Sequence, residues 1–531
     1  MKSFKLNPLN AVDSYKTSHF KMYTEGTEII YSNLTPRSDR LFVNTLSESV
    51  KRFYDNKITF FGLQGALQTI NCLWNEEFFQ KPKADVCSKY AARLVPFAGG
   101  MTVDVSHFED LHDVGYLPIE VRALPEGSQV PMGVPVFTVQ NLDRKFGWLT
   151  NYLETWFSNE IWKPSTIATI AKAYRNMLTH YAKETGSPLE FVSWQGHDFS
   201  CRGMSGMYDA ASSSTGHLVS FLGSDTISAV DYAEWAYAGD MTFVAGSVPA
   251  SEHSVMTLDG EEGETELFRR LITEVVPTGI VSLVADGYDY WKVLTETIPA
   301  LKTDILARQP DAMGFAKVVV RPDSGDPVKI VCGYSDEELS IVDGVIRVRN
   351  ADGSVSQQVI TEAERKGSIE VLWEIFGGTI TGTGHKLLDS HIGLIYGDSI
   401  TLGRMHLILE TLSKKGFASA NVVFGIGSYT YQYMTRDTFG FAMKATYAEV
   451  NGQPRNIFKA PKTDSGAKKS AKGLLAVVRD ANGEFHLQQE CTIDQVKSPD
   501  NCMKRVFSCG EFVKYQSLKE IRETANPDFV I

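Results

Sequence analysis

The stretch AKVVVRPDSGDP, residues 316–327, decides the fold of this chain. Its three consecutive valines, Val318 to Val320, lie between Lys317 and Arg321, and a turn rich in Pro, Asp and Gly follows. An apolar run without alternating polar residues is typical of a parallel strand that is buried on both faces. The stretch therefore predicts a buried strand whose carboxyl end carries a charged loop.

Five other stretches repeat this pattern of a short apolar run that ends in Asp, Gly or Arg. They are LEFVSWQGHDFSCRG (189–203), HLVSFLGSDTI (217–227), IVSLVADGYD (280–289), IGLIYGDS (392–399) and NVVFGIGS (421–428). Most are followed by helical spacing, so the series predicts parallel strands that alternate with helices. Such a series favours an α/β barrel, in which the chemistry lies at the carboxyl ends of the strands.

We expect three parts along the chain. Residues 1–160 read as a mixed α and β domain, and residues 161–430 carry the barrel. Residues 431–531 are expected to pack back on the N-terminal domain. Residues 331–386 interrupt the barrel pattern and contain a predicted β-hairpin with its turn near residues 350–353, which indicates an insertion.

The composition excludes several classes of protein. With 531 residues, 43% hydrophobic and 22% charged, the chain is an ordinary globular protein. Its net charge of −12 argues against a nucleic-acid partner, because phosphate backbones require a basic surface. The chain contains no run of 18 apolar residues, which predicts no membrane span.

The cysteines and the N-terminus predict a cytoplasmic protein. The seven cysteines are odd in number and scattered, and there is no CxxC motif, which fits a reducing compartment. The opening sequence MKSFKLNPLNAVDSYKTSHF has no apolar core of a signal peptide.

Polar side chains and glycines gather at the six predicted strand ends. They are His197, Asp198, Arg202, Asp225, Asp286, Asp289, Arg321, Asp323, Asp326, Gly397, Asp398, Gly425, Gly427 and Ser428. Glycine loops expose N–H groups to phosphate, arginines bind oxyanions, and carboxylates hold ribose hydroxyls or, through water, Mg²⁺. Together they predict a site for a sugar phosphate that carries a second anionic group.

Several residues remain open to a structural interpretation. An Asp after a strand is often a helix cap, and we assign Asp289 and Asp326 as caps or turn formers. Lys317 begins its strand, at the wrong end of a barrel for a Schiff-base lysine. His253, in VPASEHSVM (248–256), is either structural or functional. The basic stretch 436–472 is either a solvated loop or an electropositive lip for a polyphosphate.

Ten motifs, in order over nearly the whole chain, resemble the nicotinamide phosphoribosyltransferases. They are DSYKTSHF (13–20), LPIEVRALPEG (117–127), WLTNYLET (148–155), HDFSCRG (197–203), GSDT (223–226), SVPASEHS (247–254), VADGYD (284–289), VVVRPDSGDP (318–327), YGDS (396–399) and TRD (435–437). The resemblance implies the type II phosphoribosyltransferase fold: α/β, with an irregular, incomplete α/β barrel plus an α+β domain formed from the N- and C-terminal segments.

The resemblance also implies an activity and an assembly. The family joins nicotinamide to 5-phosphoribosyl 1-diphosphate, giving nicotinamide mononucleotide and diphosphate in NAD salvage. ATP hydrolysis is coupled to this through a phosphorylated histidine, Mg²⁺ takes part, and the active sites are shared within a homodimer. His253 would be the phosphate acceptor, and either Glu252 or Asp286 would orient it.

The resemblance assigns the remaining roles motif by motif. Phe199 and Tyr15 of the partner subunit would sandwich the nicotinamide ring, and Asp225 would accept a hydrogen bond from its carboxamide. Arg202 and Arg321 would hold the diphosphate, and Asp323 would hold the ribose, while Asp286 and Asp323 would bind Mg²⁺ through water. The 5′-phosphate would be held by Gly397, Asp398, Gly427, Ser428 and Arg436. ATP or diphosphate would be contacted by Arg37, Lys444, Lys459 and Lys468.

Two departures and two alternatives accompany the resemblance. The chain reads IGSY at 426–429 where vertebrate members read SGGG, and it has Ala442 where they carry serine. One alternative is a nicotinate phosphoribosyltransferase, against which Asp225 argues because it would repel a carboxylate. The other is a non-catalytic binding or signalling protein on the same scaffold, against which the full set of polar strand ends argues.

Overall fold

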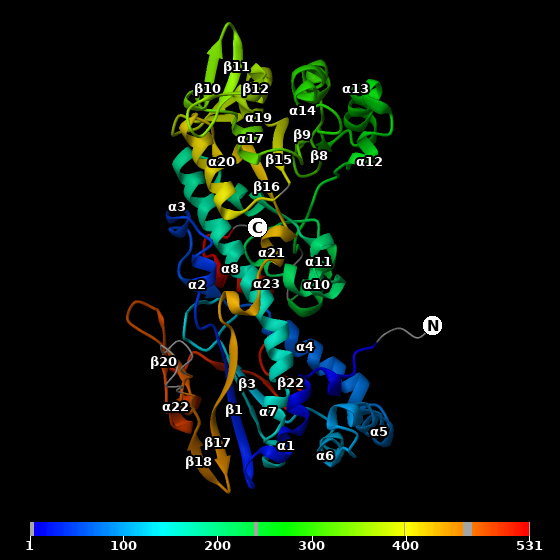
Figure 1. Cartoon of the computed structure of the whole chain (residues 1–531), viewed down its shortest axis with the longest axis vertical. Coiled ribbons are helices and arrows are strands. Elements are labelled where there is room, and N and C mark those ends of the chain that lie inside the picture. Colours follow the sequence, from blue (N-terminus) through cyan, green and yellow to red (C-terminus); the bar gives the residue numbers. More distant parts are fainter. Residues whose placement is uncertain (1–4, 238–242, 398, 460–469, 530–531) are drawn as a thin grey trace.

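The computed structural model describes residues 5–237, 243–397, 399–459 and 470–529. The molecule is elongated, with a six-stranded β-sheet in its upper part and a seven-stranded β-sheet in its lower part, besides smaller sheets (Figure 1). Helix α8 (Glu154–Thr185) joins the two parts and, at 32 residues, is about 48 Å long. Twenty of its residues are buried, because it packs against both parts rather than against one. Helix α8 continues across residue 160, where the sequence placed a domain boundary. The boundaries at 160 and 430 stay predictions.

The upper sheet confirms the predicted parallel strands. Its six strands stand in the order β7-β6-β16-β15-β9-β8, and every pair in it is parallel. The strands are β6 (Gly196–Phe199), β7 (Gly223–Ser224), β8 (Gly279–Val284), β9 (Ala316–Arg321), β15 (Ile392–Tyr396) and β16 (Val422–Gly427). Each strand lies within one of the six stretches recognised in the sequence, except that β8 begins one residue before its stretch. In the stretches 189–203 and 217–227, however, the apolar run is helical, over 189–195 and 217–219, and only the residues that follow it form the strand.

The two edges of this sheet are linked by one extended segment. Gly246 makes a parallel bridge to Gly223 at one edge, and Ala250 makes a parallel bridge to Ser282 at the other. The segment thus closes the curled sheet into an irregular barrel with few regular hydrogen bonds on that side. This confirms the predicted fold class, and it places the SVPASEHS motif in the barrel wall.

The lower sheet is antiparallel and is built from both ends of the chain. Its order is β18-β17-β1-β5-β3-β21-β22. The strands are β1 (Thr27–Thr35), β3 (Ile119–Ala123), β5 (Phe137–Asn141), β17 (Ala442–Val450), β18 (Gln453–Asn456), β21 (Lys504–Ser508) and β22 (Glu511–Phe512). Because β17 and β21 pair directly with β1 and β3, the C-terminal segment completes the N-terminal domain, as the fold prediction required.

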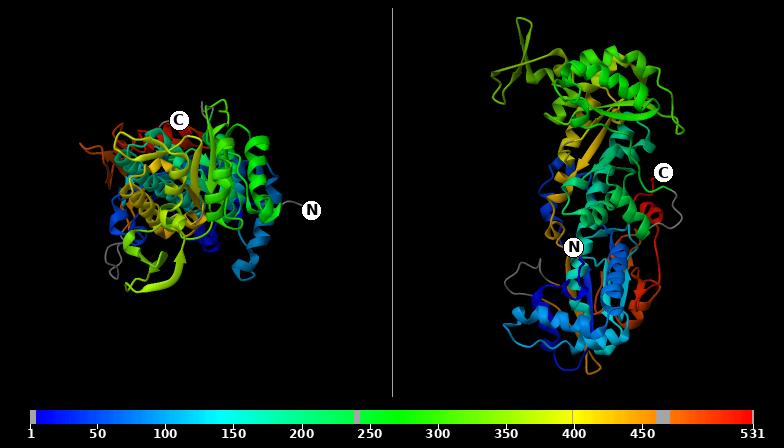
Figure 2. Two further views of the ribbon diagram at one scale, coloured as in Figure 1. Left: turned by 90° about the horizontal axis from the view of Figure 1, so that it is seen from above. Right: turned by 90° about the vertical axis from the view of Figure 1, so that its right-hand side faces the viewer.

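The predicted insertion contains a small sheet that projects from the barrel (Figure 2). Strands β10 (Leu339–Val342), β11 (Val345–Arg349) and β12 (Val355–Ile360) form an antiparallel meander. The predicted hairpin is confirmed, since the turn after β11 is closed by Asn350 and Ser354 and has Gly353 at a φ of 82°. Strand β10 adds a third strand that was not predicted from the sequence.

Candidate active site

Phe199 lies at the centre of the strand ends, over the backbone of two glycines. A Cβ atom at Gly425 would come within 2.5 Å of the Phe199 ring, and one at Gly397 within 3.4 Å. The same position on Gly397 lies 3.0 Å from Oδ1 of Asp323. The two glycines therefore leave the space that the ring occupies, and they bring Phe199 and Asp323 to one place, as predicted.

Asp225 receives two hydrogen bonds on a single oxygen. His197 Nε2 lies 2.8 Å from its Oδ1, and the Ser247 hydroxyl donates to the same atom. Burial raises the pKa of Asp225, but the hydrogen bonds from His197 and Ser247 and the charge of Arg321 outweigh burial, so its pKa lies below the usual value. Asp225 is thus an ionised acceptor, and among the described residues no donor occupies its Oδ2.

His253 is oriented by Asp286 and not by Glu252. Its Nε2 lies 3.1 Å from Oδ1 of Asp286, whose side chain is only 4% exposed, whereas the imidazole is 53% exposed. The other Asp286 oxygen accepts hydrogen bonds from the Asp323 N–H, at 3.0 Å, and from the Ser324 hydroxyl, at 2.6 Å. Glu252 instead accepts a hydrogen bond from Ser254. One buried carboxylate therefore fixes both the histidine and the loop that follows Arg321.

Arg321 ties the linking segment to that loop. Its Nη2 donates to the Ser251 carbonyl at 3.0 Å, and its Nε lies 3.4 Å from Oδ1 of Asp323. Arg202 is exposed on the turn at Cys201–Gly203, which packs against helix α21 (Ser428–Gln432). Gly427 and Ser428 form the start of that helix, so these residues share the rim with Arg202.

A second group of predicted residues lies in the lower part of the molecule. Tyr15, 61% exposed, precedes α1 (His19–Met22), which lies far below the barrel strands in Figure 1. Arg37, Lys444 and Lys459 line a cavity of about 240 Å³. The structure therefore does not bring these residues together with Phe199 within one chain. Asp398 and Lys468 lie outside the described residues.

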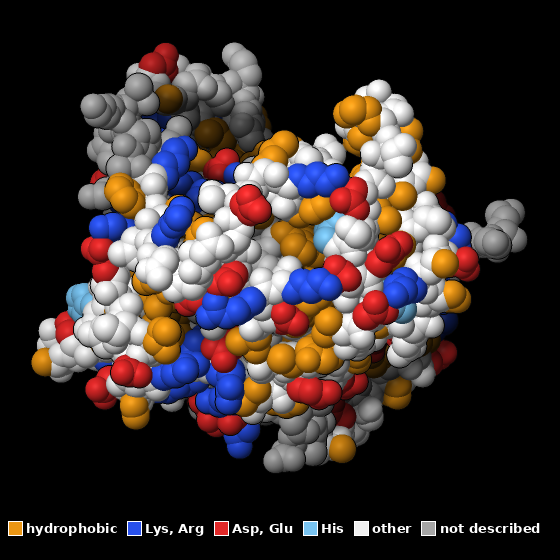
Figure 3. Space-filling view, turned by 90° about the horizontal axis from the view of Figure 1, so that it is seen from below, with side chains coloured by type: hydrophobic (Ala, Val, Ile, Leu, Met, Phe, Trp, Pro, Cys, Tyr) orange, Lys and Arg blue, Asp and Glu red, His pale blue; other side chains and the backbone are white. Residues whose placement is uncertain are grey.

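The lower group, formed by Arg37, Lys444 and Lys459, has further positively charged side chains close by. Burial lowers the pKa of Lys444 and the charge of Glu154 opposes this, while the positive charges of Arg37, Lys16 and Arg436 lower it further. Arg436 therefore lies close enough to Lys444 to contribute to this group. Viewed from below, Lys and Arg side chains are mixed with Asp and Glu over the described surface (Figure 3).

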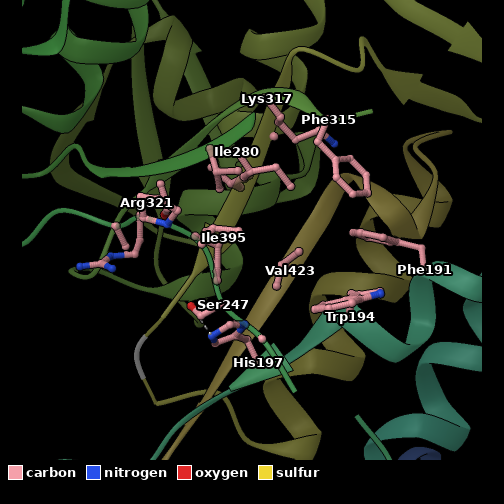
Figure 4. A pocket seen from close by; sticks show the side chains of 18 of the residues that line it. Phe191, Trp194, His197, Ser247, Ile280, Phe315, Lys317, Arg321, Ile395 and Val423 are labelled. Atoms are coloured by element: carbon pink, nitrogen blue, oxygen red, sulfur yellow. Dashed lines mark hydrogen bonds between the residues drawn. The ribbon is translucent and has the colours of Figure 1, made fainter. Parts of the chain in front are cut away.

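A tunnel of about 340 Å³ runs through the barrel from the strand ends (Figure 4). Its carboxyl-terminal mouth is lined by His197, Asp225, Ser247 and Arg321. Its opposite end is lined by Phe191, Trp194, Phe315 and Lys317.

The sequence interpretation missed two kinds of tunnel residue. Ser247 lies in a motif that was recognised, but its contact with Asp225 arises only when the linking segment closes the barrel. Lys317 was correctly placed at the amino-terminal end of its strand, but it was not identified as a residue that lines the tunnel. The alternation of side chains along 317–321 could have revealed that it faces the same interior as Arg321.

Two features are absent from the part of the chain that the structure describes. No group of three or more His, Cys, Asp and Glu side chains is placed to hold a metal ion there. No helix among the described residues is sufficiently long and apolar to cross a membrane.

Comparison with known proteins gives consistent matches over the chain. The family described as "Nicotinate phosphoribosyltransferase (NAPRTase) family" matches residues 194–511. A protein of Acinetobacter baylyi named nicotinamide phosphoribosyltransferase is 53% identical over 98% of this chain and 97% of its own length. A protein of Xanthomonas campestris with the same name is 32% identical over 98% of each chain.

Two solved structures share the fold at low sequence identity. Nicotinate-nucleotide pyrophosphorylase from Pyrococcus furiosus aligns with a TM-score of 0.54 and 16% identity, over 99% of this chain and 97% of its own. Human nicotinic acid phosphoribosyltransferase aligns with a TM-score of 0.51 and 15% identity, over 97% of this chain and 93% of its own. These two likenesses concern the fold alone.

Proposed function

The chain belongs to the nicotinate phosphoribosyltransferase (NAPRTase) family, and from this premise we propose that it is a nicotinamide-specific pentosyltransferase of NAD salvage. It transfers the 5-phosphoribosyl group of 5-phosphoribosyl 1-diphosphate to nicotinamide and releases nicotinamide mononucleotide and diphosphate. The observation that carries the choice of nicotinamide is the ionised Asp225 at the tunnel mouth beside Phe199.

Asp225 supplies the selectivity through its charge and its free oxygen. Oδ1 is held by His197 and Ser247, which leaves Oδ2 to accept a hydrogen bond from the carboxamide NH₂ of nicotinamide. Nicotinate has no proton to donate there, and its carboxylate would face a like charge. The Phe199 ring provides a flat face for the pyridine, which is electron-poor and stacks well on an aromatic ring.

The chemical step is a displacement at C1 of the ribose. The C1–O bond to diphosphate breaks as the C1–N bond to the pyridine nitrogen forms, and the bond electrons leave with diphosphate. The pyridine nitrogen already has a lone pair and loses no proton, so no general base is needed. Catalysis then rests on positioning and on stabilisation of the leaving charge, for which Arg321 and Arg202 are the candidates.

The carboxylates suit a hard cation only indirectly. Both oxygens of Asp286 already accept hydrogen bonds, and Asp323 is paired with Arg321. The donor set therefore fits Mg²⁺ that is carried by the diphosphate and held by Asp286 and Asp323 through water. When bound, the ion would neutralise part of the charge that develops on the leaving diphosphate.

His253 is the proposed site of ATP coupling. If its Nε2–H donates to Asp286, its Nδ1 keeps a lone pair and faces solvent, as a phosphate acceptor requires. The terminal P–O bond of ATP would break, an N–P bond to Nδ1 would form, and ADP would leave. The lower basic group around Arg37, Lys444 and Lys459 would supply the polyphosphate contacts.

A homodimer would unite the two groups of residues. Tyr15 and the lower basic group are separated from Phe199 within one chain, so a second copy must bring them to the strand ends. The shared site is tested with two single-substitution variants, Phe199→Ala and Tyr15→Ala, which are mixed and refolded together. Shared sites predict recovery of about a quarter of the wild-type activity, because half of the dimers carry one intact site. No recovery would contradict the shared site.

Initial rates with nicotinamide and with nicotinic acid, each with 5-phosphoribosyl 1-diphosphate and Mg²⁺, test the proposed reaction. We expect nicotinamide mononucleotide to form with a kcat/KM at least about 100-fold above that for nicotinic acid. Faster use of nicotinic acid would reject the assignment. Binding of nicotinamide without turnover would favour a non-catalytic protein. We also place the protein in the cytoplasm, in keeping with its seven free cysteines.

A further inference from the structure

The loop that follows strand β9 carries Asp323 and is mostly exposed. It runs over residues 322–326, and Ser324, Gly325 and Asp326 are all exposed. Packing therefore contributes little to its position, and a loop of this kind keeps one conformation only where hydrogen bonds fix its backbone. The proposed task of Asp323 at the ribose requires such a fixed position, so the groups that hold the loop bear on the reaction.

Strand β9 lies between β8 and β15, and a residue from the end of each neighbour holds this loop. Asp286, two residues after β8, accepts hydrogen bonds from the N–H of Asp323 and the hydroxyl of Ser324. Tyr396, the last residue of β15, donates from its hydroxyl to the carbonyls of Ser324, at 3.1 Å, and Gly325, at 2.9 Å. The loop backbone is therefore bound through an N–H by one strand end and through two carbonyls by the other.

Tyr396 is firmly placed for this contact. Its side chain is fully buried, and its strand pairs with β9 on one side and β16 on the other. A hydroxyl on a buried ring moves little, so it fixes the two carbonyls rather than following them. Gly325 has a φ of 89°, a backbone conformation that favours glycine, and this turn allows both carbonyls to face the one hydroxyl.

The residue that follows Tyr396 also lies against Asp323. A Cβ atom at Gly397 would come within 3.0 Å of Oδ1 of Asp323, so the end of β15 approaches the carboxylate itself. Two consecutive positions therefore set the place of Asp323, one through the loop backbone and one through the space that it leaves. Because its ring is buried, Tyr396 can act on the reaction only through the loop that it holds.

We propose that Tyr396 is a positioning residue for the 5-phosphoribosyl 1-diphosphate site, where it holds Asp323 in place to bind the ribose and the water shell of Mg²⁺. This inference rests on the proposed function, because it assigns Tyr396 a task at the same site. The proposed nicotinamide contacts, Phe199 and Asp225, lie at the ends of other strands. The loop therefore governs binding of the phosphoribosyl donor and not of nicotinamide.

Steady-state kinetics of Tyr396→Phe test this inference, because the substitution removes the hydroxyl and keeps the ring. We expect the KM for 5-phosphoribosyl 1-diphosphate to rise about 5- to 10-fold, while the KM for nicotinamide changes by less than about twofold. The matched control is Tyr181→Phe, since Tyr181 is also fully buried and its hydroxyl is hydrogen-bonded to Nδ1 of His406, at 3.0 Å, on helix α20 (Leu402–Lys414). The control should leave both KM values unchanged and lower the melting temperature by a similar amount.

A double substitution shows whether Tyr396 acts through Asp323. In the Asp323→Ala background, Tyr396→Phe should change the KM for the phosphoribosyl donor by less than about twofold, because the group that it positions is gone. Amide hydrogen exchange gives a second measurement that needs no turnover. Residues 322–326 should exchange faster in Tyr396→Phe than in the wild type, and at the wild-type rate in Tyr181→Phe.

Four outcomes would each overturn the inference. They are an unchanged KM for the donor in Tyr396→Phe, an equal rise in the KM for nicotinamide, an undiminished effect in the Asp323→Ala background, and unchanged amide exchange of the loop. A wild-type protein that forms no nicotinamide mononucleotide would instead reject the proposed function. Amide exchange would in that case still decide whether Tyr396 holds the loop.

Discussion

Arg321 and Lys317 face the same tunnel from the same strand, yet they differ in almost every other respect. Arg321 donates to Ser251 and lies beside Asp323, so its position is fixed by two segments of chain. Lys317, partly buried among mainly apolar walls, has no such bonds in the described part of the chain. The difference follows from strand direction, because the long polar loops of a parallel barrel lie at the carboxyl ends of its strands.

The largest expected effect concerns catalysis at the carboxyl ends of the barrel strands. Arg321→Met should lower kcat/KM for nicotinamide by about 100- to 1,000-fold, because a charge that stabilises the leaving diphosphate is lost. Lys317→Met should change the same quantity by less than about twofold. Steady-state rates of nicotinamide mononucleotide formation measure both, and an equal loss in the two variants would break the comparison.

The next effect concerns the choice between nicotinamide and nicotinic acid at the carboxyl ends of the strands. Asp225→Asn should lower kcat/KM for nicotinamide by about 10- to 100-fold and raise that for nicotinic acid, because the repulsion of a carboxylate disappears. The ratio of the two values is the informative measurement. Lys317→Met serves as the matched control and should leave the ratio unchanged. If Asp225→Asn does not shift the ratio, the selectivity has another origin.

A smaller effect is expected at His253. Asp286→Asn should reduce acid-labile labelling of the protein by γ-labelled ATP by about tenfold, because the imidazole loses the carboxylate that fixes its tautomer. Glu252→Gln should retain labelling, since Glu252 contacts Ser254 and not the imidazole. Equal loss in both variants would contradict the assignment of Asp286. Absence of labelling in the wild-type protein would remove the phosphohistidine itself.

The smallest effect is on stability at the amino end. Without ligand, Lys317→Met should raise the melting temperature by about 1–2 °C, because a partly buried ammonium is replaced by an apolar chain of similar length. Burial lowers the pKa of Lys317 below its usual 10.5, so between the lowered pKa and 10.5 the unfolded chain binds more protons than the folded one.

The wild type should therefore gain stability as pH rises through this window, and Lys317→Met should lack that gain. Urea unfolding at pH 7, 9 and 10 measures the difference. Parallel curves for the two proteins would show that Lys317 is not destabilised by burial.

The barrel strands could be predicted because their signal is local. In β8, β9, β15 and β16 the strand is the short apolar run itself, followed by polar loop residues. The apolar runs 189–195 and 217–219 are helical instead, and only the residues after them form β6 and β7. The residues at their ends, such as Asp225 and Asp323, were found for the same reason. Strand β10 was missed although the two-residue turn Asp343-Gly344, which joins it to β11, is a local hairpin signal in the sequence.

Contacts between distant segments could not be predicted in the same way. The partner of His253 is Asp286, 33 residues away, and adjacency had made Glu252 an equal candidate. The chain leaves the barrel after α21 and enters the lower sheet, which brings Arg436 close enough to Lys444 to affect its pKa, and the motif itself did not reveal this proximity. Hydrogen bonds of this kind depend on the closed barrel and leave no periodic trace in the sequence.

The sequence by itself determined the parallel strands of the barrel and the motifs of the family. These follow from local apolar patterns and short loop motifs, which need no knowledge of distant contacts. The tertiary structure alone decided that segment 246–250 closes the barrel, that Asp286 holds His253, and that Lys317 faces an apolar tunnel. The physical reason is that enclosure and pairing arise only when separate strands curl around a common interior.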